Sequence, residues 1–174
     1  MTLLKGYVQV YTGHGKGKTT AALGLSLRAA GAGLKVFIGQ FMKLGDYSEI
    51  KALKRLANSI TIEQFGPGRF VRGKPSMDDI KAAAIGIERI KSVISSGRYD
   101  MVIMEEANVA VTCGLFPVET ILKIIDEKPD HMELVITGRD ADPFIIERAD
   151  LVTEMKEVRH YFNKGVSARV GIEK

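Results

Sequence analysis

The sequence has a single cysteine, no tryptophan and no long run of apolar residues. Cys113 cannot form an internal disulfide or a thiolate metal site, and its apolar neighbours predict a buried, inert thiol. No apolar stretch approaches the roughly 18 residues that a membrane-spanning helix needs. The N-terminus also has no basic stub followed by an apolar signal region. We therefore expect a cytoplasmic protein that has no membrane partner.

What is present is the composition of a globular protein. The 174 residues are 45% hydrophobic and 26% charged, which excludes disorder and predicts one domain over residues 1–174. The net charge of +4 is a modest excess that suits an anionic ligand. A nucleic-acid partner would need a stronger basic stripe with interleaved aromatic residues, so we expect none. The 18 glycines exceed the usual share of roughly 7%, and their positions therefore matter.

Apolar, strand-like runs alternate with helical patterns along the chain. We expect strands at residues 6–12, 34–41, 60–65, 101–104, 134–137 and 151–155, and helices at 18–30, 49–56, 118–126, after Ser76 and after Pro143. Continuous apolar strands separated by helices predict an α/β fold, a mostly parallel sheet with helices on both faces. Ligands bind beyond the carboxyl ends of such strands, so the residues that follow each strand are the candidates for function.

The helix after Ser76 has the clearest boundary and the clearest face. Ser76 is followed three residues later by Asp79, which resembles an N-cap with an acidic first turn. The helical period then places one set of residues on a single face: Ile80, Ala83, Ala84, Ile87, Ile90 and Ile94.

A glycine-rich loop lies between the first expected strand and the first expected helix. It spans residues 12–19 and reads TGHGKGKT, a pattern in which backbone amides and a helix N-terminus face one anion. Lys18 would reach the phosphate oxygens, and the Thr19 hydroxyl would ligate Mg²⁺. The strict pattern has glycine six residues before the lysine, where this chain has Thr12, and Lys16 is an additional cation. The alternative is a glycine-rich turn that binds nothing.

Two acidic residues follow the strand expected at 101–104. A magnesium ion that is bound to a nucleotide needs a carboxylate at the end of a neighbouring strand. The usual pair there is Asp-Glu, so Glu105 is a longer acid than expected, and we favour Glu106 as the metal ligand. The alternative is a polar strand end with two solvated acids. Together the loop and the acids predict a nucleoside triphosphate, Mg²⁺ or Mn²⁺, and a reaction at the phosphate or the ribose.

Nearly the whole chain resembles the phosphate-loop ATP:corrinoid adenosyltransferases, which act on cob(I)alamin or cob(I)yrinic acid a,c-diamide. The segments that carry the resemblance are residues 10–43, 100–110, 136–155 and 162–173, and the shortened loop TGxGKGKTT is itself a mark of the family. The resemblance implies a P-loop NTPase-like (RecA-like) fold. It also implies an enzyme of adenosylcobalamin biosynthesis or salvage that transfers the 5′-deoxyadenosyl group of ATP to Co(I) and releases triphosphate.

The resemblance further implies a set of site residues. Lys18 and Lys16 would be the catalytic cations, and Thr19 with Glu106 would hold the metal. The ATP site would comprise Thr12, Gly13, His14, Gly15, Lys16, Gly17, Lys18, Thr19, Thr20 and Arg139. Phe70, with Arg69 and Arg72, would meet the corrinoid, although some relatives have a tryptophan at the position of Arg72.

Further expectations concern the surroundings of this site. Gln40 and Lys43 follow the second strand and are additional candidates for phosphate contacts. The first strand begins near Gly6, so we expect no leading helix of the kind that covers the active site in some members. The resemblance implies a homodimer and a flavoprotein or other reductant for Co(II).

Two other interpretations remain open at this point. A generic phosphate-loop NTPase or kinase would use Glu105 or Glu106 to position a nucleophile for attack on the γ-phosphate. The shortened loop argues against that class. A non-catalytic nucleotide-binding regulator or a nucleic-acid ATPase would carry a stronger basic surface than this chain has.

Overall fold

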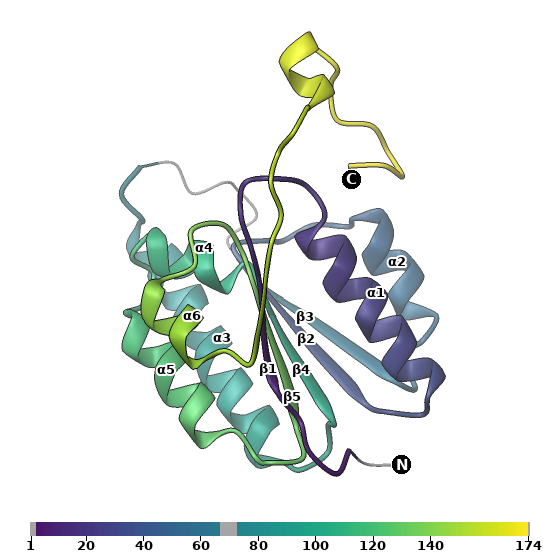
Figure 1. The fold of residues 1–174 in the computed structure, drawn as a ribbon, viewed down its shortest axis with the longest axis vertical. Helices are drawn as coiled ribbons and strands as arrows, with labels where there is room; N and C mark the ends of the chain where they lie inside the picture. The colour runs from purple at the N-terminus through teal and green to yellow at the C-terminus, as the bar shows by residue number, and fades with distance from the viewer. Residues whose placement is uncertain (1–2, 67–72, 174) are drawn as a thin grey trace.

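The computed structural model describes residues 3–66 and 73–173, which form a single twisted sheet covered by helices on both faces (Figure 1). The sheet has six strands in the order β3-β2-β4-β5-β1-β6, and every pairing is parallel. The strands are β1 (Val8–Thr12), β2 (Val36–Phe41), β3 (Ile60–Phe65), β4 (Met101–Glu105), β5 (Glu133–Thr137) and β6 (Leu151–Glu154). The expected α/β class is confirmed.

The helices divide unequally between the two faces. In Figure 1, α1 (Lys18–Gly31) and α2 (Ser48–Lys54) lie on one side of the sheet. The other side is covered by α3 (Met77–Ser95), α4 (Ala107–Thr112), α5 (Val118–Glu127) and α6 (Pro143–Arg148). The sequence does not predict α4, which begins directly after the acidic pair. None of the helices in the described ranges is long and apolar enough to cross a membrane.

Side chains of the central strands alternate between two hydrophobic cores. In β2, Val36 and Ile38 belong to the core under α1, whereas Phe37 and Phe41 belong to the core under α3. All four side chains are fully buried. Because both faces are covered, the central strands are apolar at consecutive positions, and this is the pattern that made them recognisable in the sequence.

Helix α3 confirms the expected cap and corrects one face assignment. The Ser76 hydroxyl accepts a hydrogen bond from the Asp79 backbone, and the Asp79 side chain accepts from the Ser76 backbone, which is a capping box. Ala84, however, is exposed, and Gly86 is buried. Ala84 lies about 100° around the helix from Ala83, outside the stripe that meets the sheet. At Gly86 the Phe41 and Phe65 rings approach so closely that no side chain fits.

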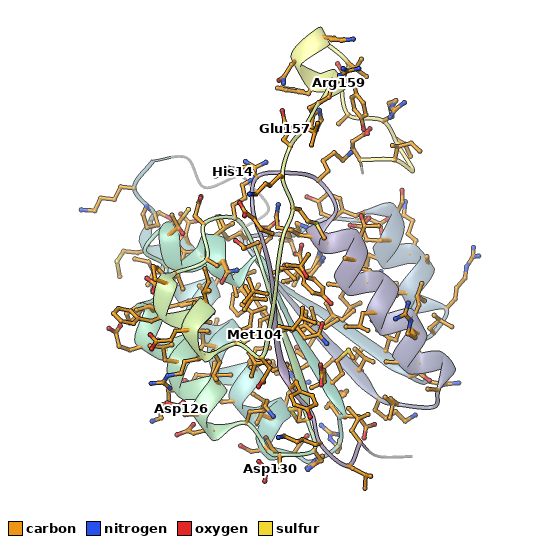
Figure 2. All side chains as sticks on the ribbon, viewed as in Figure 1. His14, Met104, Asp126, Asp130, Glu157 and Arg159 are labelled. Carbon is orange, nitrogen blue, oxygen red and sulfur yellow. The ribbon has the colours of Figure 1, made fainter. Side chains whose placement is uncertain are left out.

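The backbone is left-handed after three of the strands. Within residues 3–66 and 73–173, the non-glycine residues with positive φ are Met42 after β2, Glu106 after β4 and Asp140 after β5, at 60°, 59° and 52°. Strained backbone of this kind is concentrated at functional sites. Figure 2 shows His14 of the glycine loop at this end of the sheet and Asp126 and Asp130 at the opposite end.

We expect glycine-to-alanine changes in α3 and α1 to have opposite effects on stability. A Cβ at Gly86 would lie 2.7 Å from Phe65 Cγ, so Gly86→Ala should destabilise the protein by about 1–3 kcal/mol. At Gly24 in α1 no atom lies within 4 Å of the added Cβ, so Gly24→Ala should stabilise by about 0.5–1 kcal/mol through the unfolded chain. Urea unfolding of both variants measures this difference, and equal effects would contradict the packing at Gly86.

Candidate active site

The glycine loop is shaped by the chain that leaves β6. The Gly15 amide donates to the Met155 carbonyl at 2.7 Å. A Cβ at Gly13 would lie 2.5 Å from the same Met155 oxygen, and one at Gly15 would lie 2.8 Å from the Lys156 carbonyl carbon. Gly13 also has a φ of 92°, which side chains rarely adopt. These glycines are therefore required by the protein's own backbone as well as by any phosphate.

Helix α1 begins directly after the loop with its first turn open to a ligand. Its N-cap is Gly17, at a φ of 118°, and none of the described residues caps the helix with a side chain. Its first amides and its positive dipole end point toward the space enclosed by the loop, the usual arrangement for binding an anion.

Lys18 is folded into the loop. Its ammonium donates to the Gly13 carbonyl at 2.6 Å and to the Gly15 carbonyl at 2.8 Å, and the side chain is buried. Burial lowers the pKa of Lys18, an effect that the negative charge of Glu106 opposes and that the nearby Arg139 reinforces. The structure thus brings Arg139, expected in the ATP site, within electrostatic range of Lys18.

The acidic pair divides into a buried and a partly exposed residue. Glu105 is fully buried, and its Oε1 accepts a hydrogen bond from the Thr19 hydroxyl at 2.5 Å. Glu106 is the N-cap of α4, and its backbone amide donates to the Thr137 hydroxyl at 3.1 Å. Our sequence analysis favours Glu106 for the metal, whereas the structure brings Thr19 together with Glu105.

Lys43 compensates the buried charge of Glu105. Its ammonium donates to Glu105 Oε1 at 2.9 Å, the same oxygen that accepts from Thr19. Burial raises the pKa of Glu105, and Lys43 acts against this shift. Burial alone would lower the pKa of Lys43, but the Glu105 carboxylate outweighs it, so the pKa of Lys43 is raised. The two side chains form a partly buried ion pair, in which Glu105 is fully buried and Lys43 is partly exposed.

The donor set at Glu105 fits a hard cation that is shared with a substrate. Glu105 Oε2 is buried and has no hydrogen-bond partner among the residues that the structure describes. Within the same ranges, no cluster of three or more His, Cys, Asp or Glu side chains could hold a metal by itself. Mg²⁺ normally takes one or two protein ligands and completes its octahedron with phosphate oxygens and water. Glu105 and the Thr19 hydroxyl match that requirement.

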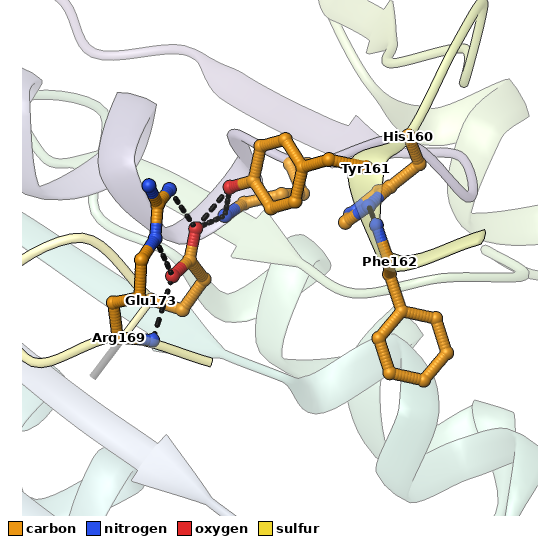
Figure 3. Close-up of polar contacts among 6 residues, drawn as sticks. His160, Tyr161, Phe162, Arg169 and Glu173 are labelled. Atoms are coloured by element: carbon orange, nitrogen blue, oxygen red, sulfur yellow. Dashed lines mark hydrogen bonds and ion pairs between the residues drawn. The ribbon is translucent and has the colours of Figure 1, made fainter. Parts of the chain in front are cut away.

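Lys16 points away from the loop and toward the C-terminal tail, which we define as residues 155–173. Its ammonium donates to the Tyr161 hydroxyl and to Glu173 Oε1, each at 3.0 Å. Glu173 also accepts from Arg169 and from the Tyr161 hydroxyl (Figure 3). Arg169, followed by Tyr161, holds the pKa of Glu173 well below its usual range. The tail reaches past the loop, as Glu157 and Arg159 beyond His14 show in Figure 2.

The remaining expected residues have varied positions. The Thr12 hydroxyl accepts from the Ala141 amide at 3.2 Å, and His14 Nε2 lies 3.1 Å from Asp140 Oδ1. Thr20 is exposed on α1, and Arg139 is exposed after β5. Cys113 is half-buried rather than buried, although burial does raise the pKa of its thiol.

The residues expected to meet the corrinoid, Arg69, Phe70 and Arg72, lie outside the described residues. Gly66, the last described residue before them, packs against the chain that follows β2. A Cβ at Gly66 would lie 2.5 Å from the Lys43 backbone nitrogen. The described chain before this gap therefore ends, at Gly66, beside the backbone of Lys43.

Comparisons with known proteins agree on one family. The family model described as ATP:corrinoid adenosyltransferase BtuR/CobO/CobP matches residues 4–173. A corrinoid adenosyltransferase of Pseudomonas aeruginosa is 32% identical over 97% of this chain and 84% of its own length. A corrinoid adenosyltransferase of Escherichia coli K12 is also 32% identical, over 97% of this chain and 86% of its own. The corrinoid adenosyltransferase CobA of Salmonella typhimurium is 31% identical over the same shares.

Glu173 competes with the phosphates of ATP for Lys16, so we expect Glu173→Gln to tighten the binding of Mg-ATP. The gain should be about two- to fivefold, because an exposed ion pair such as Lys16–Glu173 is weak. Isothermal titration calorimetry measures the affinity. Glu157→Gln is the matched control, since it removes the same charge from the same tail. Glu157 accepts a hydrogen bond from Asn163 instead of from Lys16. Equal gains in both variants would indicate a general charge effect and contradict the role of Lys16.

Proposed function

The chain belongs to the ATP:corrinoid adenosyltransferase family, and we propose that its glycine loop and the Glu105 end of β4 stabilise the triphosphate of ATP as a leaving group. The activity of the chain is the transfer of the adenosyl group of ATP to a corrinoid. One observation carries the proposal for the site: consecutive residues in the first turn of α1 place the Lys18 ammonium in the glycine loop and the Thr19 hydroxyl on Glu105.

The reaction requires little acid–base chemistry from the protein. Reduced cobalt of the corrinoid donates an electron pair to the ribose 5′ carbon, a Co–C bond forms, and the C–O bond to the triphosphate breaks. The triphosphate leaves with the electron pair of that bond. Because Co(I) is already a strong nucleophile, the protein must align the two reactants and stabilise the charge that develops on the departing oxygen.

The loop residues suit that task. Lys18 would exchange its two carbonyl partners in the loop for phosphate oxygens, and the first amides of α1 would donate to the same anion. The Thr19 hydroxyl and the Glu105 carboxylate would hold Mg²⁺, whose charge neutralises phosphate oxygens when it is bound. Lys16 would add a further charge once it leaves Glu173. Arg139 would contribute from the end of β5.

Phe70, with Arg69 and Arg72, would contact the corrinoid, as the resemblance to the family implies. These three residues lie outside the described ranges, and the last described residue before them, Gly66, packs against the backbone of Lys43. Three expectations remain predictions from the family. They are the identity of the corrinoid as cobalamin or cobyrinic acid a,c-diamide, the homodimer, and the reductant for Co(II).

The first test mixes the protein with ATP, Mg²⁺ and chemically reduced corrinoid. We expect intact triphosphate and the spectrum of a Co–C bond, and Lys18→Met should lower kcat by about 10²–10³, as removal of a transition-state donor does elsewhere. Lys123→Met, on the exposed face of α5, is the control and should retain full activity. Release of phosphate or diphosphate without corrinoid would instead indicate an NTPase or kinase.

The second test separates the two acids. Because Glu105 contacts Thr19, Glu105→Gln should weaken Mn²⁺ binding in the presence of ATP by about 10- to 100-fold, measured by electron paramagnetic resonance. Glu106→Gln removes the same charge from the adjacent residue and should have a smaller effect. The reverse order would assign the metal to Glu106.

A further inference from the structure

We propose that Lys43 is a placeholder for the metal ion at Glu105 in the nucleotide-free site, and that its ammonium moves to the triphosphate when the metal binds. The proposal rests on the proposed function. Lys43 would first position the Glu105 carboxylate and would then, once the metal is bound, contact the substrate directly.

Thr19 and Lys43 share one carboxylate oxygen of Glu105. Glu105 Oε1 accepts from Thr19 at 2.5 Å and from Lys43 at 2.9 Å, at a carboxylate that is fully buried. A buried carboxylate is stable only with a compensating charge. Lys43 supplies that charge in the structure. A divalent cation held by Thr19 and Glu105 would supply it instead and would repel the ammonium at close range. Lys43 and the metal therefore compete for Glu105.

Lys43 does not satisfy two buried polar atoms of the described residues near this ion pair. Glu105 Oε2 is a buried acceptor and Gln40 Nε2 a buried donor, and neither has a partner among the described residues. Gln40 and Glu105 are register partners on β2 and β4, so their side chains project to the same face of the sheet. An acceptor and a donor side by side match a water of a hydrated metal ion. The ammonium therefore balances the charge of Glu105 without satisfying the polar groups around it.

The side chain of Lys43 can move while its backbone stays anchored. The Gly45 amide donates to Gln64 Oε1 at 3.1 Å, and Gln64 Nε2 donates to Gln40 Oε1 at 3.0 Å, which ties the chain after β2 to the sheet. On the other side, Gly66 packs against the Lys43 backbone. The Lys43 side chain is itself 23% exposed. It can swing from Glu105 to a phosphate oxygen while its backbone stays in place.

The consequence is a site that keeps its charges paired both without and with nucleotide. Without nucleotide, Lys43 neutralises Glu105. With nucleotide, the metal ion takes that role, and Lys43 joins Lys18 among the cations around the leaving group. The triphosphate therefore gains a ligand only when the metal is present, which couples the binding of the two.

The test uses the full chain with Mn²⁺ alone and with inorganic tripolyphosphate, so it requires no corrinoid. Lys43→Met removes the charge and keeps the length of the side chain. We expect this variant to bind Mn²⁺ about tenfold more tightly without nucleotide, because Lys43 no longer competes for Glu105. We expect it to bind tripolyphosphate about tenfold more weakly at saturating Mg²⁺, because one charge-assisted contact to the phosphates is lost. Lys51→Met, at an exposed lysine of α2, is the control and should change neither affinity.

The opposite signs separate this role from a structural one. If Lys43 only supported the fold, Lys43→Met would bind both Mn²⁺ and tripolyphosphate more weakly, and that result would overturn the proposal. An unchanged affinity for either ligand would also overturn it. Lys43→Arg should restore tripolyphosphate binding, because it keeps the charge. If Lys43→Met does not fold, Lys43→Gln gives the same comparison with a side chain that can still donate to Glu105.

Failure of this inference is distinguishable from failure of the proposed function. If wild-type protein binds no tripolyphosphate, the leaving-group function of the loop is wrong. If the wild type and Lys43→Met bind both ligands equally, the loop retains its function and only the role of Lys43 is wrong.

Discussion

The buried carboxylate of Glu105 is the constraint on which the site depends. A charge at the end of a central strand must be compensated, and the compensation comes from two other elements: Thr19 in the first turn of α1 and Lys43 after β2. These contacts hold the start of α1 against β4, although β5 lies between β4 and β1, the strand that leads into α1. The same first turn carries Lys18, so the contact between Thr19 and Glu105 also places the buried cation of the glycine loop.

A second constraint comes from the edge of the sheet. β6 is an exposed edge strand, yet the chain that leaves it crosses the glycine loop so closely that Gly13 and Gly15 have no room for a side chain. The tail then carries Tyr161 and Glu173 to Lys16. One basic residue of the loop is thus directed inward and the other outward. The loop is shaped jointly by its glycines and by a segment more than a hundred residues away.

Patterns with a local cause were predictable. The strands were recognised because burial on both faces requires continuous apolar runs, and the start of α3 because Ser76 and Asp79 are in the right spacing for a cap. Contacts with a non-local cause were not. Ala84 lies one residue from a buried position but faces solvent, and Gly86 is buried because two phenylalanine rings from the sheet reach it. The short α4 has too few residues to show a helical period.

By itself, the sequence determined the fold class, the position of the glycine loop between a strand and a helix and, through its resemblance to one family, the reaction, because these depend on residue order over short stretches. Only the tertiary structure decided which acid meets Thr19, because Glu105 and Glu106 are neighbours in sequence and differ only in direction. Glu105 continues the strand, and its side chain meets Thr19 of α1, whereas Glu106 adopts a left-handed conformation at the N-cap position of α4. The pairing of Lys43 with Glu105 and of Lys16 with Glu173 was decided in the same way, since each joins segments that are distant in the chain and adjacent only after the sheet has formed.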